Sequence, residues 1–423
     1  MIILFGSLAV FLALGVPVFA AIGLAAAIYL VINDIPVLIS VQQMFDGIDK
    51  FPLLAVPFFI LAGNLMNAAG ITDRLFAFAR SLVGHVRGGL GHVNILASLI
   101  FSGMSGTAVA DAGGLGTVEL KAMRDQGYDT GFAIGITAAS STIGPIIPPS
   151  LAMVVYGVVG NVSIGKLFVA GIVPGLLMAV CLHAIVFYFA VRRDYPRDPR
   201  ASLRQVSRTF RSGFLALMTP IIIVGGIIGG VVTPTEAAVV AVLYALIIGV
   251  IAYRTLNVDN VLSVLRESFE TTAITMIMVA ASVLFGWILV RENVASQFAQ
   301  TMLEFATEAW HALLILNVIL LIAGVFMETI AVILILTPIL APTLSAFDID
   351  PVHFGVVMVL NLMIGLMTPP IGLLLFVMAR IGKLDLFATI RAVFPFLLPL
   401  FVVLILISVF PWISLFLPRL VYG

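Results

Sequence analysis

Cysteine and charged residues are scarce in this 423-residue sequence. The single cysteine, Cys181, excludes an intrachain disulfide framework and lies in an apolar stretch, where a small packing residue is expected. Charged side chains make up only 10% of the chain, and 21 basic residues balance 21 acidic ones. The zero net charge indicates no nucleic-acid partner, and so few polar residues exclude a soluble domain of this length.

Hydrophobic residues make up 62% of the sequence, with a mean hydropathy of +1.22. A lipid bilayer demands long apolar stretches, at about 20 residues per spanning helix. Residues 1–32 are apolar and the first basic residue is Lys50, whereas a cleaved signal peptide normally begins with positive charge. We therefore expect an all-α polytopic membrane protein, with residues 1–32 as mature membrane helix.

One basic segment, residues 191–212, interrupts the apolar pattern. From Arg192 to Arg211 it carries seven arginines against two aspartates, so the positive-inside rule predicts a cytoplasmic linker. The linker separates two halves, 1–190 and 213–423. With the linker inside, 17 basic residues lie on the cytoplasmic side and four outside, and both termini are predicted to be periplasmic.

The two halves repeat each other in order. Matching residues fall at offsets between 217 and 223, and they are Pro17 with Pro234, Gly63 with Gly286, Asn94 with Asn317, Gly103 with Gly324, Asp129 with Asp350, Pro148 and Pro149 with Pro369 and Pro370, and Pro174 with Pro395. An ordered series at a nearly constant offset predicts an internal repeat. Each half is expected to hold five full spans, an odd number, so the two structural repeats should be inverted relative to each other.

Each repeat is predicted to contain a re-entrant helical hairpin followed by a discontinuous helix. The hairpin is expected at 94–120 and the broken helix at 131–157 in the first repeat, and at 312–344 and 352–379 in the second. The remaining helices are expected near residues 2–14, 17–32, 51–70, 71–91, 166–190, 214–231, 235–253, 271–290, 291–310 and 392–417.

Helix-breaking residues mark the hairpin tips and the broken helices. They read SGMSGT at 102–107 and GPIIPP at 144–149, then GVFMET at 324–329 and GLMTPP at 365–370. Proline frees helix carbonyls, which in lipid need a partner such as a dehydrated cation, while exposed helix N-termini offer amides to an anion. Glycine and proline also serve as simple kinks, but four breaks at repeat-related positions favour a binding function.

Hydroxyl groups near the breaks add possible ligands. Ser105, Thr107 and Thr368 suit sodium, although serine and threonine also bond back to helix carbonyls. The stretch 103–106 also resembles the serine motif of rhomboid-type intramembrane proteases. Such an enzyme needs a histidine on a neighbouring helix, and only His183 lies in the middle of a span.

Three acids, Asp111, Glu236 and Glu328, lie inside apolar segments, where a charge costs about 2.5–3.5 kcal/mol. Glu328 is the strongest candidate because it lies at a hairpin tip. Glu236 follows Thr233 and equally fits the start of a helix. The sequence does not decide whether Asp111 faces water or protein.

Motifs for enzymatic chemistry are weak or incomplete. The stretch GNVSIGK at 160–166 resembles a nucleotide-binding loop, but Leu167 stands where Ser or Thr must hold magnesium, so ATP binding is rejected. No HExxH or paired Cys/His spacing indicates a metal enzyme. We therefore predict no catalytic residues and no enzymatic activity.

Six stretches form an ordered set of motifs across both halves. They are FILAGNLMNAAGITDRL at 59–75, FSGMSGTAVAD at 101–111, GPIIPPS at 144–150, TPTEAA at 233–238, METIAVILILTPILAP at 327–342 and GLMTPPIGLLLF at 365–376. With these motifs, nearly the whole chain resembles the large membrane subunit of TRAP (tripartite ATP-independent periplasmic) transporters. Asn64 stands where a carboxylate is more frequent in that family, and Met104 where serine is frequent.

The resemblance implies sodium-driven import across a bacterial inner membrane by an elevator mechanism. The hairpins and broken helices would form a transport domain that slides against a scaffold. One sodium site would use Ser105, Thr107, Gly144, Ile147 and Pro149, and a second would use Gly324, Met327, Glu328, Gly365, Met367 and Thr368. A small organic anion, such as a C4-dicarboxylate, sialic acid or another acidic sugar, would bind between the tips, at Ser102, Gly103, Gly106, Pro145, Thr329 and Pro369.

The resemblance also implies two protein partners. These are a periplasmic substrate-binding protein and a small four-helix membrane subunit, with the lipid bilayer around them and Na⁺ in place of ATP as the energy source. A self-sufficient sodium/divalent-anion symporter and a passive channel stay open as alternatives. The sequence leaves substrate, sodium stoichiometry and oligomeric state undecided.

Overall fold

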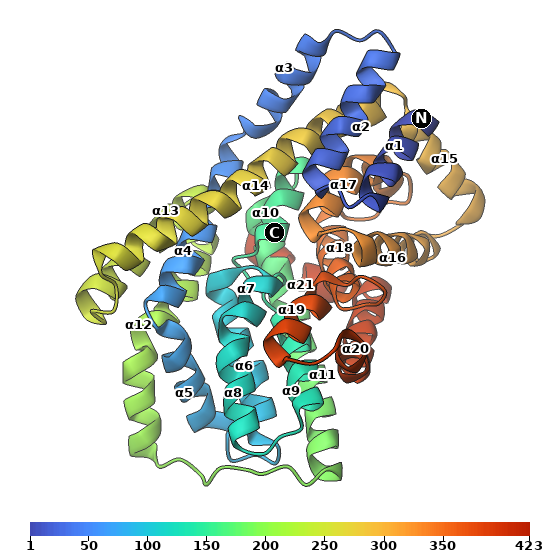
Figure 1. Ribbon diagram of the computed structural model, residues 1–423. Coiled ribbons are helices and arrows are strands. Elements are labelled where there is room, and N and C mark those ends of the chain that lie inside the picture. Colours follow the sequence, from blue (N-terminus) through green and yellow to red (C-terminus); the bar gives the residue numbers. More distant parts are fainter.

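The computed structural model describes the backbone of all 423 residues and every side chain except that of Ser105. Every described regular element is a helix, so the predicted all-α class is confirmed (Figure 1). Residues up to the linker form α1 (Ile2–Ala13), α2 (Val18–Ile32), α3 (Val37–Ile48), η1 (Phe51–Leu54), α4 (Ala55–Ala68), α5 (Ile71–Val83), α6 (Gly89–Ser105), α7 (Ala108–Gly113), α8 (Leu115–Asp125), α9 (Thr130–Ser141), α10 (Leu151–Val159) and α11 (Ile164–Arg192).

The second part of the chain has a similar series of helices. They are α12 (Leu203–Ile228), α13 (Pro234–Ile247), η2 (Ile248–Ala252), α14 (Val258–Arg291), α15 (Val294–Phe305), α16 (Ala309–Phe326), α17 (Thr329–Ala346), α18 (Pro351–Leu366), α19 (Leu373–Gly382), α20 (Leu386–Val409) and α21 (Trp412–Tyr422). Two helices are interrupted where the sequence predicted it, between α9 and α10 and between α18 and α19.

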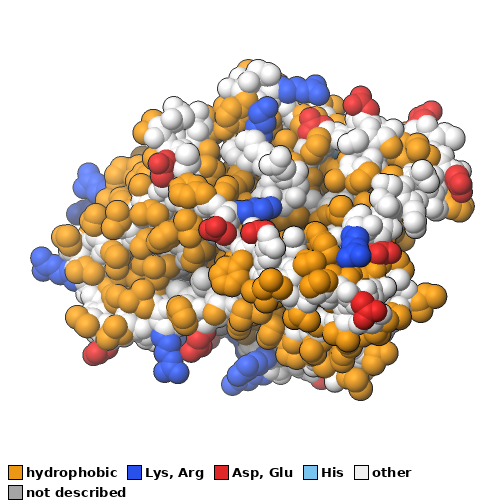
Figure 2. Space-filling view, turned by 90° about the horizontal axis from the view of Figure 1, so that it is seen from above, with side chains coloured by type: hydrophobic (Ala, Val, Ile, Leu, Met, Phe, Trp, Pro, Cys, Tyr) orange, Lys and Arg blue, Asp and Glu red, His pale blue; other side chains and the backbone are white. Residues whose placement is uncertain are grey.

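Eight stretches of the described chain are helical, long and apolar enough to cross a membrane. They are η1 with α4, α11, α12, α13 with η2, α14, α16, α17 and α20. Large apolar side chains on these helices are exposed, as at Phe269 (73%) and Phe387 (79%). Figure 2 shows hydrophobic side chains over much of the surface seen from above, with charged groups scattered among them. Such a surface suits lipid rather than water.

The first halves of the two broken helices are the most enclosed elements. Every residue from Phe132 to Ser141 in α9, and from Val352 to Leu366 in α18, is buried. Helix α9 packs against α20, and α18 packs against α16. Both helices end inside the molecule, and the first interruption is also largely buried, whereas the second reaches the surface at Pro370 and Ile371.

The same type of cap begins both of these helices. The Asp129 carboxylate accepts a hydrogen bond from the Phe132 amide at 2.9 Å, and the Asp350 carboxylate accepts one from the Val352 amide at 2.7 Å. An aspartate at this position satisfies amides that have no partner within the helix. The two aspartates are a repeat-related pair in the sequence, so the matching residues also have matching structural roles.

The structure differs from the predicted elements in four places. Helix α14 begins at Val258, where the Asn257 side chain caps it, and not near residue 271. Helix α3, with exposed Leu38 and Phe45, was not predicted, because its apolar pattern is short and ends at Asp46 and Asp49. Helix α12 begins at Leu203, within the predicted linker, where the Ser202 hydroxyl caps it. The last predicted span divides into α20 and α21, because Pro411 cannot continue the ladder of helix hydrogen bonds.

The extended part of the linker, residues 193–202, runs beneath the helices at the bottom of Figure 1. The Asp198 amide donates to the Gly84 carbonyl at 2.9 Å, just after α5. The Tyr128 hydroxyl, at the end of the α8 turn, donates to the Pro196 carbonyl at 3.0 Å. The linker therefore contacts both α5 and the turn between α8 and α9.

Candidate functional site

The first hairpin tip lies directly against the first helix break. Gly106 ends α6 with a positive φ of 63°, and a Cβ there would lie 2.7 Å from the Pro149 carbonyl oxygen. The Gly106 carbonyl accepts a hydrogen bond from the Leu151 amide at 3.4 Å. The Thr107 hydroxyl caps α7 by accepting from the Ala110 amide at 3.3 Å. Only glycine allows this left-handed turn to approach the break so closely.

The second tip meets the second break in the same way. The Val325 carbonyl accepts a hydrogen bond from the Gly372 amide at 3.3 Å, at the start of α19. A Cβ on Gly365 would lie 2.7 Å from the carbonyl carbon of Gly324, so the two backbones are in direct contact. The Thr368 hydroxyl donates to the Ile364 carbonyl at 2.7 Å. In both halves a tip carbonyl thus receives an amide from the beginning of the second half-helix.

Both tips and both broken helices line one small cavity of about 50 Å³. Its wall combines the first tip, the first break, the second tip and the end of α18, through Gly106, Thr107, Ala108, Val109, Pro145, Leu151, Ala152, Glu328, Thr329, Ile330, Met363 and Leu366. Segments more than 200 residues apart in the chain therefore share one site, which is lined by the first residues of α7, α10 and α17. The peptide bonds before Pro149 and Pro370 are both cis.

The three acids singled out in the sequence have different surroundings. Asp111 is 1% exposed in α7, and it lies against Gly144, where a Cβ would be 2.6 Å from its Oδ2 atom. It therefore faces protein at the first break. The half-buried Glu328 caps α17, accepting from the amides of Ile330 at 2.9 Å and Ala331 at 3.3 Å.

Glu236 is a capping residue outside the cavity. Its carboxylate accepts from the Thr233 amide at 2.8 Å, and the Thr233 hydroxyl accepts from the Glu236 amide at 3.3 Å. This reciprocal pair is a capping box, which satisfies two amides at the start of α13. Of the two interpretations of Glu236, helix initiation accounts for its position.

Some of the other residues predicted for the site line the cavity, and the rest do not. Gly106, Pro145 and Thr329 line the cavity, whereas Ser102 donates to the Leu99 carbonyl at 2.6 Å within α6. Gly103 packs against Pro220 of α12. The positions that belong to the breaks or tips without lining the cavity are Gly144, Ile147, Pro149, Gly324, Met327, Gly365, Met367, Thr368 and Pro369. The Ser105 side chain lies outside the described residues.

A buried polar network in the first half was missed by the sequence analysis. The Asn94 side-chain amide donates to the Glu119 carboxylate and to the Thr137 hydroxyl, both at 2.7 Å. The Ser140 hydroxyl donates to Asn94 Oδ1 at 2.6 Å, and Glu119 is 1% exposed. Glu119 lies four residues after Leu115 and four before Met123, so the helical period already indicated its buried face. The charges that follow it obscured this signal.

Asn317, which corresponds to Asn94 in the second half, forms a similar contact. The Asn361 side-chain amide in α18 donates to the Asn317 carbonyl at 2.9 Å and to its side-chain oxygen at 2.8 Å. Asn317 in turn donates to the Ser408 hydroxyl at 2.9 Å. An asparagine in each hairpin therefore fixes that hairpin to the neighbouring broken helix.

The side chains at the tips and breaks offer oxygen ligands, namely the hydroxyls of Thr107, Thr329 and Thr368 and the carboxylates of Asp111 and Glu328. Within the described residues, no group of three or more His, Cys, Asp or Glu side chains could hold a metal ion. Hard cations accept neutral oxygen ligands, so this donor set fits sodium better than it fits a transition metal.

Comparison with known proteins gives a consistent family. Residues 5–413 match the family model described as tripartite ATP-independent periplasmic transporter, DctM component. The chain is 50% identical to the Vibrio cholerae sialic acid TRAP transporter large permease protein SiaM, over 97% of this chain and 96% of that protein. It is 41% identical to the Pseudomonas aeruginosa C4-dicarboxylate TRAP transporter large permease protein DctM, over 89% and 88%.

A solved structure provides a likeness in fold. The crystal structure of the Alcanivorax borkumensis YdaH transporter superimposes with a TM-score of 0.66, covering 89% of this chain and 88% of that one. The sequence identity is 15%, so this likeness concerns the fold alone.

Proposed function

Because this chain belongs to the DctM component family of tripartite ATP-independent periplasmic transporters, we propose that it is the translocating subunit for sodium-coupled import of a small organic anion. The chain is a multi-pass inner-membrane protein, and its relatives are named as permeases rather than enzymes. The cavity shared by both tips and both breaks carries the proposal. There, amides at helix starts suit a carboxylate, and carbonyls suit a cation.

The proposed cargo is a carboxylate, with sialic acid ahead of C4-dicarboxylates. This order follows the relatives, since the one named for sialic acid is 50% identical and the one named for C4-dicarboxylates is 41% identical. A cavity of about 50 Å³ is smaller than either anion, so the tips must separate before cargo enters.

The two proposed sodium sites lie where each tip meets its break. In the first, Thr107 and the carbonyls around Gly144 and Pro149 surround the junction, with Asp111 alongside. In the second, Glu328 and Thr368 flank the contact between Gly324 and Gly365. Sodium bound in this way would hold a tip and a broken helix together and so prepare the anion site.

We propose an elevator mechanism with two inverted repeats, 1–190 and 213–423. Helices α6 to α10 and α16 to α19 would form the moving transport domain, and α4, α12, α13 and α14 would belong to the scaffold. The matched caps at Asp129 and Asp350 support the repeat. In this arrangement the linker is cytoplasmic and both termini are periplasmic.

The proposed partners are a periplasmic substrate-binding protein and a small membrane subunit. The exposed apolar faces of the scaffold helices offer room for the small subunit beside lipid, as at Phe269 and Ile274. A substrate-binding protein would deliver cargo from the periplasmic side, so this chain alone would be only part of the transporter.

Transport in proteoliposomes tests the proposal. The chain, its small subunit and the binding protein are reconstituted, and uptake of labelled sialic acid and labelled succinate is followed under an inward sodium gradient. We expect uptake of one of them with sodium and none when potassium replaces it. Equal uptake in both salts would contradict sodium coupling. Undiminished uptake without the binding protein would instead favour a self-sufficient symporter.

A further inference from the structure

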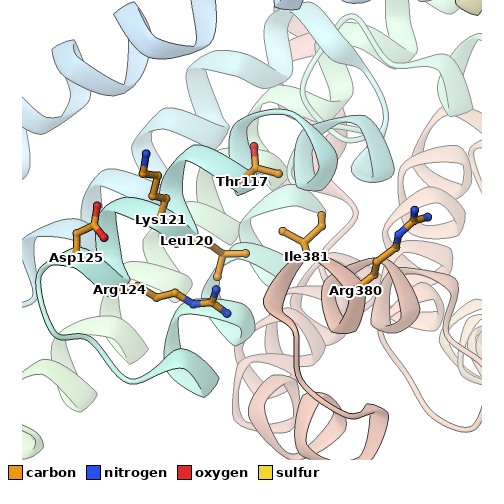
Figure 3. A pocket seen from close by; sticks show the side chains of 7 residues that line it. All are labelled: Thr117, Leu120, Lys121, Arg124, Asp125, Arg380 and Ile381. Carbon is orange, nitrogen blue, oxygen red and sulfur yellow. The ribbon is translucent and has the colours of Figure 1, made fainter.

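A second cavity, separate from the paired tips, lies between α8 and α19 (Figure 3). Its volume is about 580 Å³, within the range of small-molecule sites. Three of its lining side chains are basic, Lys121 and Arg124 from α8 and Arg380 from α19, whereas Asp125 is its one acidic lining residue. The cavity therefore carries an excess of positive charge contributed by two helices that are far apart in the sequence.

The positive charge of this cavity is not neutralised by ion pairs. Within the described part of the chain, none of the three basic side chains forms a salt bridge. Lys121 and Arg380 are exposed, and Arg124 is half-buried. Figure 3 shows Lys121 and Arg124 on one side of the view and Arg380 on the other, with Leu120 and Ile381 between Lys121 and Arg380. A concave surface lined by one sign of charge focuses the field and concentrates counter-ions.

Arg124 is the residue most directly prepared for a ligand. Its Nη2 atom donates to the Gly382 carbonyl, which fixes the guanidinium between α8 and α19. Its Nε atom is buried and has no hydrogen-bond partner among the described residues. A guanidinium presents its N–H groups as a fork that matches a carboxylate, and Arg124 brings this group to the wall of the cavity.

The helices around this cavity lead from the paired tips. Helix α7, which begins after Thr107 at the first tip, continues into α8, while α19 begins after the second break at Gly372. Helix α7 also packs against α19. The α7–α8 segment therefore runs from the proposed anion site to the basic cavity, and α19 reaches that cavity from the second break.

We propose that the basic cavity binds organic carboxylates on the cytoplasmic side, as an exit site for the imported anion. The direction and the cargo rest on the proposed function, whereas binding of a carboxylate rests on the cavity alone. The positive-inside rule would place basic residues on this side. That rule does not explain why basic residues of two helices converge on one cavity. Nor does it explain why a buried guanidinium N–H of Arg124 has no partner among the described residues.

Thiol labelling of the detergent-solubilised protein tests the charge of the cavity. Thr117 is an exposed lining residue, and Thr117→Cys in a Cys181→Ala background gives a single thiol. The measured quantity is the ratio of the labelling rate with an anionic methanethiosulfonate to the rate with a cationic one. We expect this ratio to be about ten-fold higher at Thr117→Cys than at a control position. The double change Lys121→Gln with Arg380→Gln should remove most of this preference.

The matched control is Ser263→Cys in the same background. Ser263 is exposed in α14, one turn from Asp259, Arg266 and Glu267, and because Arg266 is paired with Glu270 the charge around Ser263 is net acidic. The reagent preference should be lost or reversed there. Equal preferences at Thr117→Cys and Ser263→Cys, or no reaction of either reagent at Thr117→Cys, would overturn the proposal.

Protection by carboxylates tests the ligand. Millimolar sialic acid and succinate are added separately, and at least one should slow labelling of Thr117→Cys without slowing that of Ser263→Cys. The double variant should lose this protection. If neither compound protects, the cavity is not a carboxylate site. The labelling assay needs no transport, so a failure of carboxylate binding here can be told apart from a failure of sodium-coupled import in proteoliposomes.

Discussion

The Arg80 guanidinium of α5 donates two hydrogen bonds to the Asp198 carboxylate of the linker, at 2.7 and 3.1 Å. Gln126, just after α8, donates to the same carboxylate at 3.2 Å. The hydrogen bonds from Arg80 lower the pKa of Asp198. Burial opposes this shift, and the hydrogen bond from Gln126 adds to it. One linker side chain therefore ties α5 to the end of the first hairpin.

Asp198→Asn should lower the thermal stability of the purified protein at neutral pH, by about 1 kcal/mol or less because the pair is partly exposed. A carboxylate with a lowered pKa stabilises the fold above its unfolded-state pKa and loses this effect as the pH falls through its folded-state pKa. The difference in melting temperature from wild type should therefore vanish on acidification. Asp194→Asn, at an exposed linker position, is the control, and an equal loss there would contradict the specific role of Asp198.

Gly106→Ala should damage the junction of the first tip and the first break. The new methyl group would meet the Pro149 carbonyl oxygen at 2.7 Å, and the positive φ disfavours any side chain. We expect a loss of about 1–3 kcal/mol of stability together with severely reduced uptake. Gly113→Ala is the control, since nothing lies within 4 Å of its added carbon. Wild-type melting and uptake in the Gly106 variant would show that the close approach is not needed.

Asn94→Ala should destabilise the first hairpin more than Glu119→Gln does. The alanine removes the donor to both Glu119 and Thr137, leaving a buried carboxylate without its hydrogen bond, at a cost of about 1–3 kcal/mol. The glutamine keeps an oxygen that can accept from Asn94. Thermal unfolding of both variants measures the order, and a larger loss for Glu119→Gln would contradict this account of the network.

Glu328→Gln should separate capping from ion binding at the second tip. An amide oxygen can still accept from Ile330 and Ala331, so stability should stay close to that of wild type. The lost charge should raise the sodium concentration for half-maximal uptake about ten-fold, equivalent to about 1.4 kcal/mol. Glu308→Gln is the control, because Glu308 precedes α16 but its side chain does not cap that helix. This change should leave the sodium dependence unchanged. A wild-type sodium titration for the Glu328 variant would remove this carboxylate from the proposed site.

The elements most accessible to sequence reasoning were those fixed by local chemistry. Proline and glycine at 144–149 and 365–370 predicted the interruptions that separate α9 from α10 and α18 from α19. The helix start at Thr233, Pro234 and Glu236 was one of two interpretations that the sequence left open, and the capping box in the structure decides for it. The TRAP family was also recognised from the ordered motifs, and the match over 5–413 confirms it.

The remaining features depend on contacts between distant segments, which local patterns do not report. Glu119 gains its partner from Asn94, 25 residues earlier, and the basic cavity requires Arg124 to meet Gly382, 258 residues later. Helix α12 extends into the arginine-rich linker because Ser202 caps it. Charge composition predicted a linker there but did not distinguish a helix from a loop, because basic side chains suit an interfacial helix as well as a loop.

Sodium-dependent thermal stabilisation is the most direct test of the central claim, that the tips and the interrupted helices bind sodium. A ligand that binds only the folded state stabilises it by about 2.7 kcal/mol at 100 times its dissociation constant. The account predicts that the melting temperature of the purified protein rises with sodium chloride but not with equimolar potassium chloride, and that Thr368→Ala reduces the rise. The same melting temperature in both salts, across the whole titration, would contradict it.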